Sequence, residues 1–249
     1  MTTPSSSASN PRRMPPASAE LATAWAFLED GLGEIMANGP IKYSKYMTLY
    51  TVAYNYCASS MYGVRDSAVS AGNRSKYFHA LLPLQREDAL SDNDGDRTDD
   101  ANINAAGAEV IGSELYDNLV RYFALHVKGV KEKSDRLQGE ALLRYYAGEW
   151  DRYTTGANYI NRLFTYLNRH WVKPAQKEGR VGVYPVYTLA LVQWKSIFFL
   201  DGQNELAGII HRLIESERNG QTINHGHIKK VIDSFISLGL DEDVNKASL

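Results

Sequence analysis

The chain is organised around Tyr43-Ser-Lys-Tyr-Met-Thr-Leu-Tyr-Thr-Val-Ala-Tyr-Asn-Tyr-Cys57, which follows the breaker pair Gly39-Pro40 and meets no further breaker before Gly63. This spacing predicts one helix that ends near Met61. At about 100° per residue, one apolar face, called the Tyr/Met face below, consists of Tyr43, Tyr46, Met47, Tyr50, Tyr54 and Cys57. Leu49, Val52, Ala53 and Tyr56 form a second apolar face beside it.

Two apolar faces cover roughly two-thirds of this helix, which is more than the stripe of about 100° that a single core contact uses. Periodicity alone favours a helix that is buried on all sides within its own domain. The alternative is that one face packs on the core and the Tyr/Met face packs on a partner, because Tyr and Met are frequent at binding surfaces.

Composition narrows the class of protein. The 249 residues carry a net charge of -2, which argues against a nucleic-acid partner, and no apolar run approaches the roughly 18 residues that a membrane span needs. Cys57 is the single cysteine, and the Ser/Pro/Ala-rich start has no apolar signal core. These features predict an intracellular protein with no membrane partner, and we expect it in cytoplasm and nucleus.

The first hundred residues contain two segments without helical periodicity. Residues 1 to 17 are rich in Ser, Pro, Thr and Ala and are expected to be a flexible tail, followed by a helix with Ser18 as its N-cap and Gly39-Pro40 as its end. Residues from about 63 to 107 are expected to be a mobile insert. Within it, the apolar patch 77–84 is either a docked segment or a binding motif, and its acidic cluster does not match a calcium loop.

The remaining residues show helical spacing throughout. A third helix is predicted around residues 111–122, a fourth around 137–150 with a capping pair at Ser134-Asp135, and a fifth after Thr154-Thr-Gly156. Later helices are expected at 184–199, 205–218 and 227–238. No strand or hairpin pattern is present, so the sequence predicts an all-α fold of paired helices, an α-solenoid.

The fifth predicted helix has an unusual flank beside its core stripe. That flank consists of Tyr159, Arg162, Tyr166, Arg169 and Lys173. A flank that is both aromatic and basic is either a solvated face or a partner surface, and spacing alone favours the solvated face.

No motif for catalysis or cofactor binding is present. The sequence has no Gly-rich phosphate loop, no set of zinc ligands and no nucleophile motif, so catalytic residues, metals and cofactors are all predicted to be none. His225 and His227 form a close pair without a third ligand nearby, and Cys57 lies among tyrosines on a helix. The sequence therefore argues against an enzyme.

Four motifs in order resemble the N-terminal part of the cullin family, most closely its cullin-1 branch. They are the stretch 44–57, Tyr166-Leu-Asn-Arg-His-Trp-Val172, Tyr187-Thr-Leu-Ala-Leu-Val-Gln-Trp194 and Ile214-Glu-Ser-Glu-Arg-Asn-Gly-Gln-Thr-Ile223. The resemblance covers residues from about 18 to 242, interrupted by the insert. It implies one complete five-helix cullin repeat at 18–180 and the beginning of a second, truncated repeat at 181–249.

The resemblance implies a scaffold segment of a multisubunit SCF-like ubiquitin ligase. In such proteins the second and fifth helices bind a Skp-type adaptor that carries an F-box protein, and a cullin exchange factor is a further candidate partner. The match places Tyr46, Met47 and Tyr166 at the adaptor contact, while Tyr43, Tyr50 and Arg162 are added from helical spacing. The RING-finger subunit binds a C-terminal domain that this chain lacks, so we expect no ligase activity from the chain alone.

Two other functions remain open at this stage. A general α-solenoid module with a different partner is favoured if the Tyr/Met face is buried inside the domain. A nucleic-acid binder would use the basic flank of the fifth helix, but the first four predicted helices carry no matching basic stripe.

Overall fold

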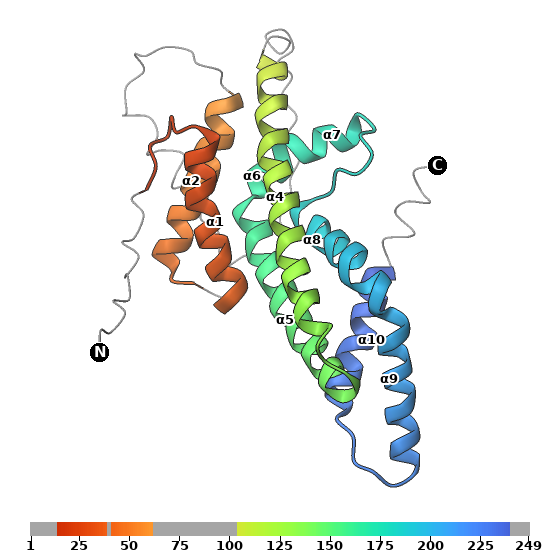
Figure 1. The fold of residues 1–249 in the computed structure, drawn as a ribbon. Helices are drawn as coiled ribbons and strands as arrows, with labels where there is room; N and C mark the ends of the chain where they lie inside the picture. Colours follow the sequence, from red (N-terminus) through yellow and green to blue (C-terminus); the bar gives the residue numbers. More distant parts are fainter. Residues whose placement is uncertain (1–13, 39–40, 62–103, 240–249) are drawn as a thin grey trace, which may run out of the picture.

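The computed structural model describes residues 14–38, 41–61 and 104–239, and every regular element in these ranges is helical (Figure 1). The elements are α1 (Leu21–Asn38), α2 (Tyr43–Met61), α4 (Asn104–Ser134), α5 (Gly139–Leu163), α6 (Thr165–Leu167), the π-helical turn η2 (Asn168–Val172), α7 (Lys173–Lys177), α8 (Val186–Trp194), the π-helical turn η3 (Lys195–Phe199), α9 (Leu200–Arg218) and α10 (His225–Gly239). The all-α prediction is confirmed. Most of the predicted insert, with its 77–84 patch, lies outside the described residues.

The helices follow one another along an elongated molecule. In Figure 1, α1 and α2 lie at one end, the long helices α4 and α5 cross the middle, and α9 and α10 lie at the other end. Helix α5 contacts α1, α2 and α4 as well as α8, α9 and α10. It therefore connects the two ends of the solenoid.

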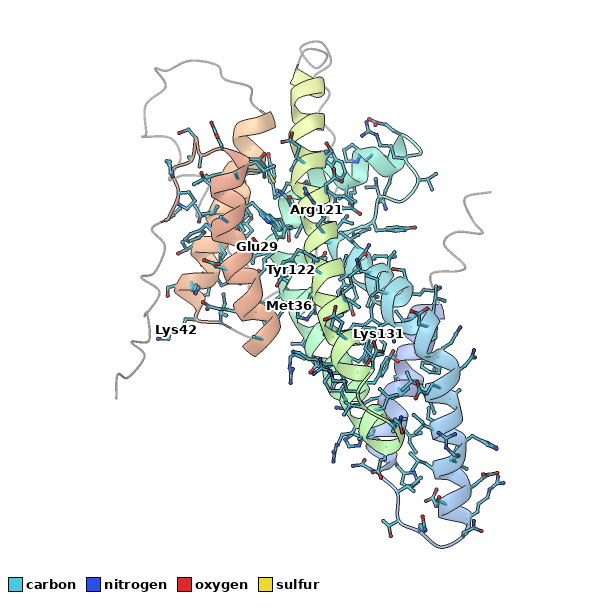
Figure 2. All side chains as sticks on the ribbon, viewed as in Figure 1. Glu29, Met36, Lys42, Arg121, Tyr122 and Lys131 are labelled. Carbon is cyan, nitrogen blue, oxygen red and sulfur yellow. The ribbon has the colours of Figure 1, made fainter. Side chains whose placement is uncertain are left out.

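A continuous apolar core runs through these contacts. In α1, Leu28, Leu32 and Ile35 are fully enclosed. Met36 and Tyr122, labelled in Figure 2, lie between α1 and the α4–α5 pair. Apolar side chains spaced three or four residues apart thus form one stripe per helix, as the periodicity predicts.

The core at the α5–α8 contact is aromatic. The ring of Trp194 in α8 lies 4.8 Å from that of Tyr153 and 5.6 Å from that of Tyr146, both in α5. Their polar atoms are paired: the Tyr153 hydroxyl donates to the Ala190 carbonyl at 2.7 Å, and Trp194 Nε1 donates to the Tyr146 hydroxyl at 3.2 Å. Buried aromatic side chains with paired polar atoms add apolar area without an unsatisfied group.

The end of the predicted tail contacts the first two helices. Pro15 is buried, and residues 15–17 line a small pocket together with Ala24 of α1 and Val52 of α2. Residues 15–17 of the predicted tail thus lie against α1 and α2, and the flexibility of the tail stays a prediction. Residues 1–13 lie outside the described residues. Ser18 lies in a turn before Glu20, and α1 begins at Leu21, so Ser18 is not the N-cap.

The predicted boundary at Thr154-Thr-Gly156 is also wrong. Helix α5 continues through this site to Leu163, and the chain leaves helical geometry at Phe164, where φ is -98° and ψ is 25°. Gly156 is there for packing: a Cβ at this position would lie 2.4 Å from Met36 Sδ of α1. The fifth helical segment of the described chain is therefore the run from α6 through η2 to α7.

Three further boundaries differ from the predictions. Helix α4 begins at Asn104, inside the predicted insert, and extends to Ser134, whose hydroxyl donates to the Lys131 carbonyl. Ser134 thus belongs to the end of α4 and does not cap α5, whose N-cap is Gln138. Helix α9 begins at Leu200, because η3 joins α8 to α9 without a break at Gly202.

Candidate protein-binding surface

The buried side of α2 matches the predicted core face. Leu49, Val52, Ala53 and Tyr56 are all buried, and the helix approaches α1 so closely that a Cβ at Gly31 would lie 2.4 Å from Leu49 Cδ2. Cys57, predicted on the Tyr/Met face, is instead only 9% exposed. Cys57 is buried because α2 packs against α4 as well as α1, so a wider arc of the helix is covered than predicted.

The rest of the Tyr/Met face is incompletely covered. Tyr43 is 56% exposed, while Tyr46, Met47, Tyr50 and Tyr54 are half-buried. Burial raises the pKa of Tyr46 to about 12, and the nearby Arg162 guanidinium opposes this rise by stabilising the phenolate. The Tyr/Met face of α2 is therefore partly covered by neighbouring helices and partly exposed to solvent.

Tyr166 meets α2 through a row of rings. The ring centroids of Tyr50 and Tyr54 are 6.3 Å apart, and those of Tyr54 and Tyr166 are 4.9 Å apart in an edge-to-face arrangement. The Tyr166 ring in turn lies 4.2 Å from His170 of η2. This aromatic row, Tyr50, Tyr54, Tyr166 and His170, joins the second and fifth helical segments, in keeping with the preference of such rings for edge-to-face contact.

The predicted site residues lie on α2 and on the two neighbouring segments α5 and α6. The structure brings Tyr46 close to Arg162 of α5, and it brings Tyr50 and Tyr166 into the aromatic row. Tyr43 and Met47 share the outer side of α2 with them. Arg162 is exposed and lies in the last turn of α5, one segment earlier than predicted. Whether these six residues bind a partner remains a prediction.

Three residues near this site were missed. Tyr54 was on the predicted Tyr/Met face and Tyr159 on the predicted aromatic flank, so helical spacing alone could have included both. Tyr159 lies near Tyr46, and its phenolate would raise the Tyr46 pKa further. His170 could not be placed from spacing, because the π-helical turn shifts every position after Asn168.

The asparagines near this surface have a structural role. Asn168 Oδ1 accepts the backbone N–H of Val186 at 3.0 Å, and Asn161 Oδ1 accepts that of Tyr187 at 3.2 Å. Asn168 Nδ2 also donates to Asn161 Oδ1 at 2.8 Å. Because the N-cap residue Pro185 offers no side-chain acceptor, these two asparagines supply the caps of α8 from neighbouring helices.

The histidines, Cys57 and the carboxylates of the described ranges are the remaining candidates for a metal site or a reactive group. Within the described ranges, no group of three or more His, Cys, Asp or Glu side chains could hold a metal ion. Burial raises the pKa of the Cys57 thiol to about 12, so the reactive thiolate is disfavoured. His225 pairs with Glu217 at 2.9 Å. None of the helices described has the length and apolar character needed to cross a membrane.

Comparison with known proteins places this arrangement in a family. Residues 25–247 match the family model described as the cullin alpha solenoid domain. The chain is 34% identical to Cullin-1 of Caenorhabditis elegans over 239 residues, which is 96% of this chain and 27% of the relative. It is 32% identical to Cullin-1 of Dictyostelium discoideum over 93% of this chain and 26% of the relative.

A yeast relative matches a similar share of the chain. Cell division control protein 53 of Saccharomyces cerevisiae is 28% identical over 247 residues, which is 94% of this chain and 26% of the relative. The chain thus spans about a quarter of the length of the curated relatives it matches. The family model matches most of the chain, and the chain belongs to the cullin family.

Proposed function

We propose that this chain is the adaptor-binding stalk of a cullin-1-type scaffold in an SCF-like ubiquitin ligase. It binds a Skp-type adaptor, and through it an F-box substrate receptor, with the surface formed by α2, the end of α5 and the α6–η2 segment. The chain is a non-catalytic scaffold segment. The family resemblance assigns the RING-finger subunit to a part of cullins outside this chain, so ligase activity is not expected here.

The observation that carries this proposal is the incomplete cover of the Tyr/Met face. Leu49, Val52 and Ala53 already satisfy the core, yet Tyr43 is mostly exposed and Tyr46 and Met47 are half-buried. Large aromatic side chains and Met at the centre of a surface are the residue types that anchor protein interfaces. The adjacent rings of Tyr54 and Tyr166 make this surface continuous across two helical segments.

Calorimetric titration of the chain with a purified adaptor bound to its F-box segment tests the proposal. Wild type is expected to bind, and Tyr166→Ala is expected to raise Kd about 30-fold, because truncating an anchor ring typically costs about 2 kcal/mol. Leu200→Ala is the matched control, since Leu200 is an exposed apolar residue at the start of α9, a helix that lies away from α2 and α6. Absence of binding by wild type, or an equal loss in both variants, would contradict the assignment.

A further inference from the structure

The charge around the candidate surface has one sign. In the sequence, every charged side chain between Glu34 and Asp66 and between Asp151 and Glu178 is basic. The described parts of these two segments are α2 and the run from the second half of α5 to α7. The whole chain is slightly acidic, with a net charge of -2, so this local excess of cations is not a reflection of composition.

The cations at this surface are largely unpaired. In the described ranges, Lys45 pairs with Glu34 and Arg152 pairs with Glu149, but no carboxylate pairs with Arg162, Arg169 or Lys173. All three of these side chains are exposed. Glu114 of α4 is exposed and lies near Tyr56, which belongs to the core side of α2 and not to the Tyr/Met face. The surface therefore presents positive charge without an internal counter-charge.

Arg162 lies next to the apolar centre of the surface. Its guanidinium is close enough to the Tyr46 hydroxyl to favour the phenolate, and Arg169 is close enough to His170 to disfavour the imidazolium. Cations thus lie beside both ends of a strip that runs from Tyr46 to the aromatic row. An apolar centre with a charged rim is the anatomy of a protein–protein interface.

We propose that the surface of the adaptor that seats on this strip is acidic, with a carboxylate opposite Arg162 and further carboxylates facing Arg169 and Lys173, so that association is electrostatically steered. This inference rests on the proposed adaptor function. The charge complementarity selects a protein with acidic residues around an apolar patch. A nucleic acid fits less well, because its phosphate backbone is bound mainly by many cations, whereas this chain as a whole carries a net charge of -2.

Stopped-flow association kinetics with the adaptor–F-box complex, followed over a series of salt concentrations, test this inference. We expect the association rate constant of wild type to fall steeply with salt, because exposed charges are screened beyond about 10 Å at 0.1 M. Arg162→Glu is expected to lower this rate constant by about 10-fold at low salt and to flatten its salt dependence, with a smaller effect on the dissociation rate. Arg162→Gln is expected to fall between the two.

Arg212→Glu is the matched control, because it makes the same change in net charge on an exposed position of α9, at the far end of the molecule. Equal slowing by Arg162→Glu and Arg212→Glu, or a wild-type rate that does not depend on salt, would overturn the inference while leaving the adaptor function intact. If wild type does not bind the adaptor at all, the proposed function fails and the inference fails with it. Tighter binding of a duplex or single-stranded oligonucleotide than of the adaptor, lost in Arg162→Glu, would assign the surface to nucleic acid instead.

Discussion

At the scale of single residues, Asn168 gives the clearest link between a sequence motif and stability. Asn168→Ala removes the acceptor for the Val186 N–H and the donor to Asn161, and we expect it to lower the free energy of unfolding by about 1–2 kcal/mol. Asn168→Asp keeps the acceptor but loses the donor, so it should fall between Ala and wild type. Thermal melts of the three proteins measure this order, and an Ala variant as stable as wild type would mean that water replaces both hydrogen bonds.

His126 is expected to make the stability of the fold depend on pH. Its ring lies between those of Tyr122 and Tyr153, and burial, with Lys133 and Arg152 nearby, lowers its pKa below the ordinary 6.5. A lowered pKa of a base means that the unfolded chain takes up the proton first, so stability is lost as pH falls below about 6.5.

We therefore expect the wild-type Tm to fall between about pH 7.5 and about pH 5.5, and His126→Phe to show a smaller fall because Phe keeps the stacked ring without a charge. His170 keeps part of the dependence, since burial and Arg169 lower its pKa as well. The comparison requires melts of both proteins at both pH values. Equal falls in the two proteins would show that His126 does not contribute.

At the scale of elements, the glycines of α5 separate packing from helix propensity. Gly156→Ala puts a methyl group 2.4 Å from the sulfur of Met36, a side chain that is itself buried, and should destabilise the protein by about 1–3 kcal/mol. Gly148→Ala, in the same helix, meets no atom within 4 Å and should stabilise it by up to about 1 kcal/mol. Chemical denaturation of both variants provides the measurement. A Gly156→Ala variant as stable as Gly148→Ala would mean that α1 moves away from α5 at no cost.

Gly156 also shows why the helices could be predicted from the sequence only in part. Apolar spacing correctly predicted α1, α2 and the buried faces of the later helices, because a stripe of apolar residues has one stable burial. The pattern could not predict the end of α5, since a glycine that breaks a helix and a glycine that permits close packing look alike in sequence. The π-helical turns η2 and η3 were also unpredictable, because they depend on contacts between helices rather than on local propensity.

The candidate site could likewise be predicted from the sequence only in part. Spacing put Tyr46, Met47 and Tyr50 on one side of α2, and it placed Arg162 and Tyr166 on a common flank. It could not show that Tyr54 contacts Tyr166, because that contact joins residues more than a hundred positions apart. Cys57 was misplaced for the same reason, since its burial depends on the approach of α4.

At the scale of the whole molecule, α5 and α10 should differ in local stability. Helix α5 contacts helical segments along most of the molecule, whereas α10 packs mainly on α5 and buries Ile228, Val231 and Leu238. Helices of a solenoid are stabilised chiefly by their neighbours, so a helix with fewer neighbours opens more readily. Hydrogen exchange is expected to show lower protection in α10 than in α5. Equal protection would mean that the whole described chain opens as one unit.

The hydrogen bond between the Tyr146 hydroxyl and Ser234 Oγ, at 3.1 Å, connects α10 to the aromatic core. Ser234→Ala removes this contact from a fully buried site, and we expect a loss of about 1 kcal/mol that appears mainly as faster exchange in α10. Ser237→Ala is the control, because Ser237 is exposed on the same helix. Faster exchange throughout α5 as well would indicate that the bond stabilises the core rather than the docking of α10.

The central claim is that the two sides of α2 have different roles, one in the core and one in binding. Tyr46→Ala combined with Met47→Ala tests it most directly, with Leu49→Ala as the control, in calorimetric titrations with the adaptor and thermal melts of each variant. Two anchor side chains at about 2 kcal/mol each predict a Kd raised about 10³-fold. Because Tyr46 and Met47 are only half-buried, the double variant should remain folded.

Leu49 is 1% exposed, so Leu49→Ala should lower stability by about 2–5 kcal/mol and leave the affinity of the folded protein unchanged. This division of roles between the two sides of α2 thus predicts a loss of affinity without unfolding in one variant and a loss of stability without weaker binding in the other. A Tyr46/Met47 double variant that melts far below wild type yet binds the adaptor with normal affinity when folded would contradict it.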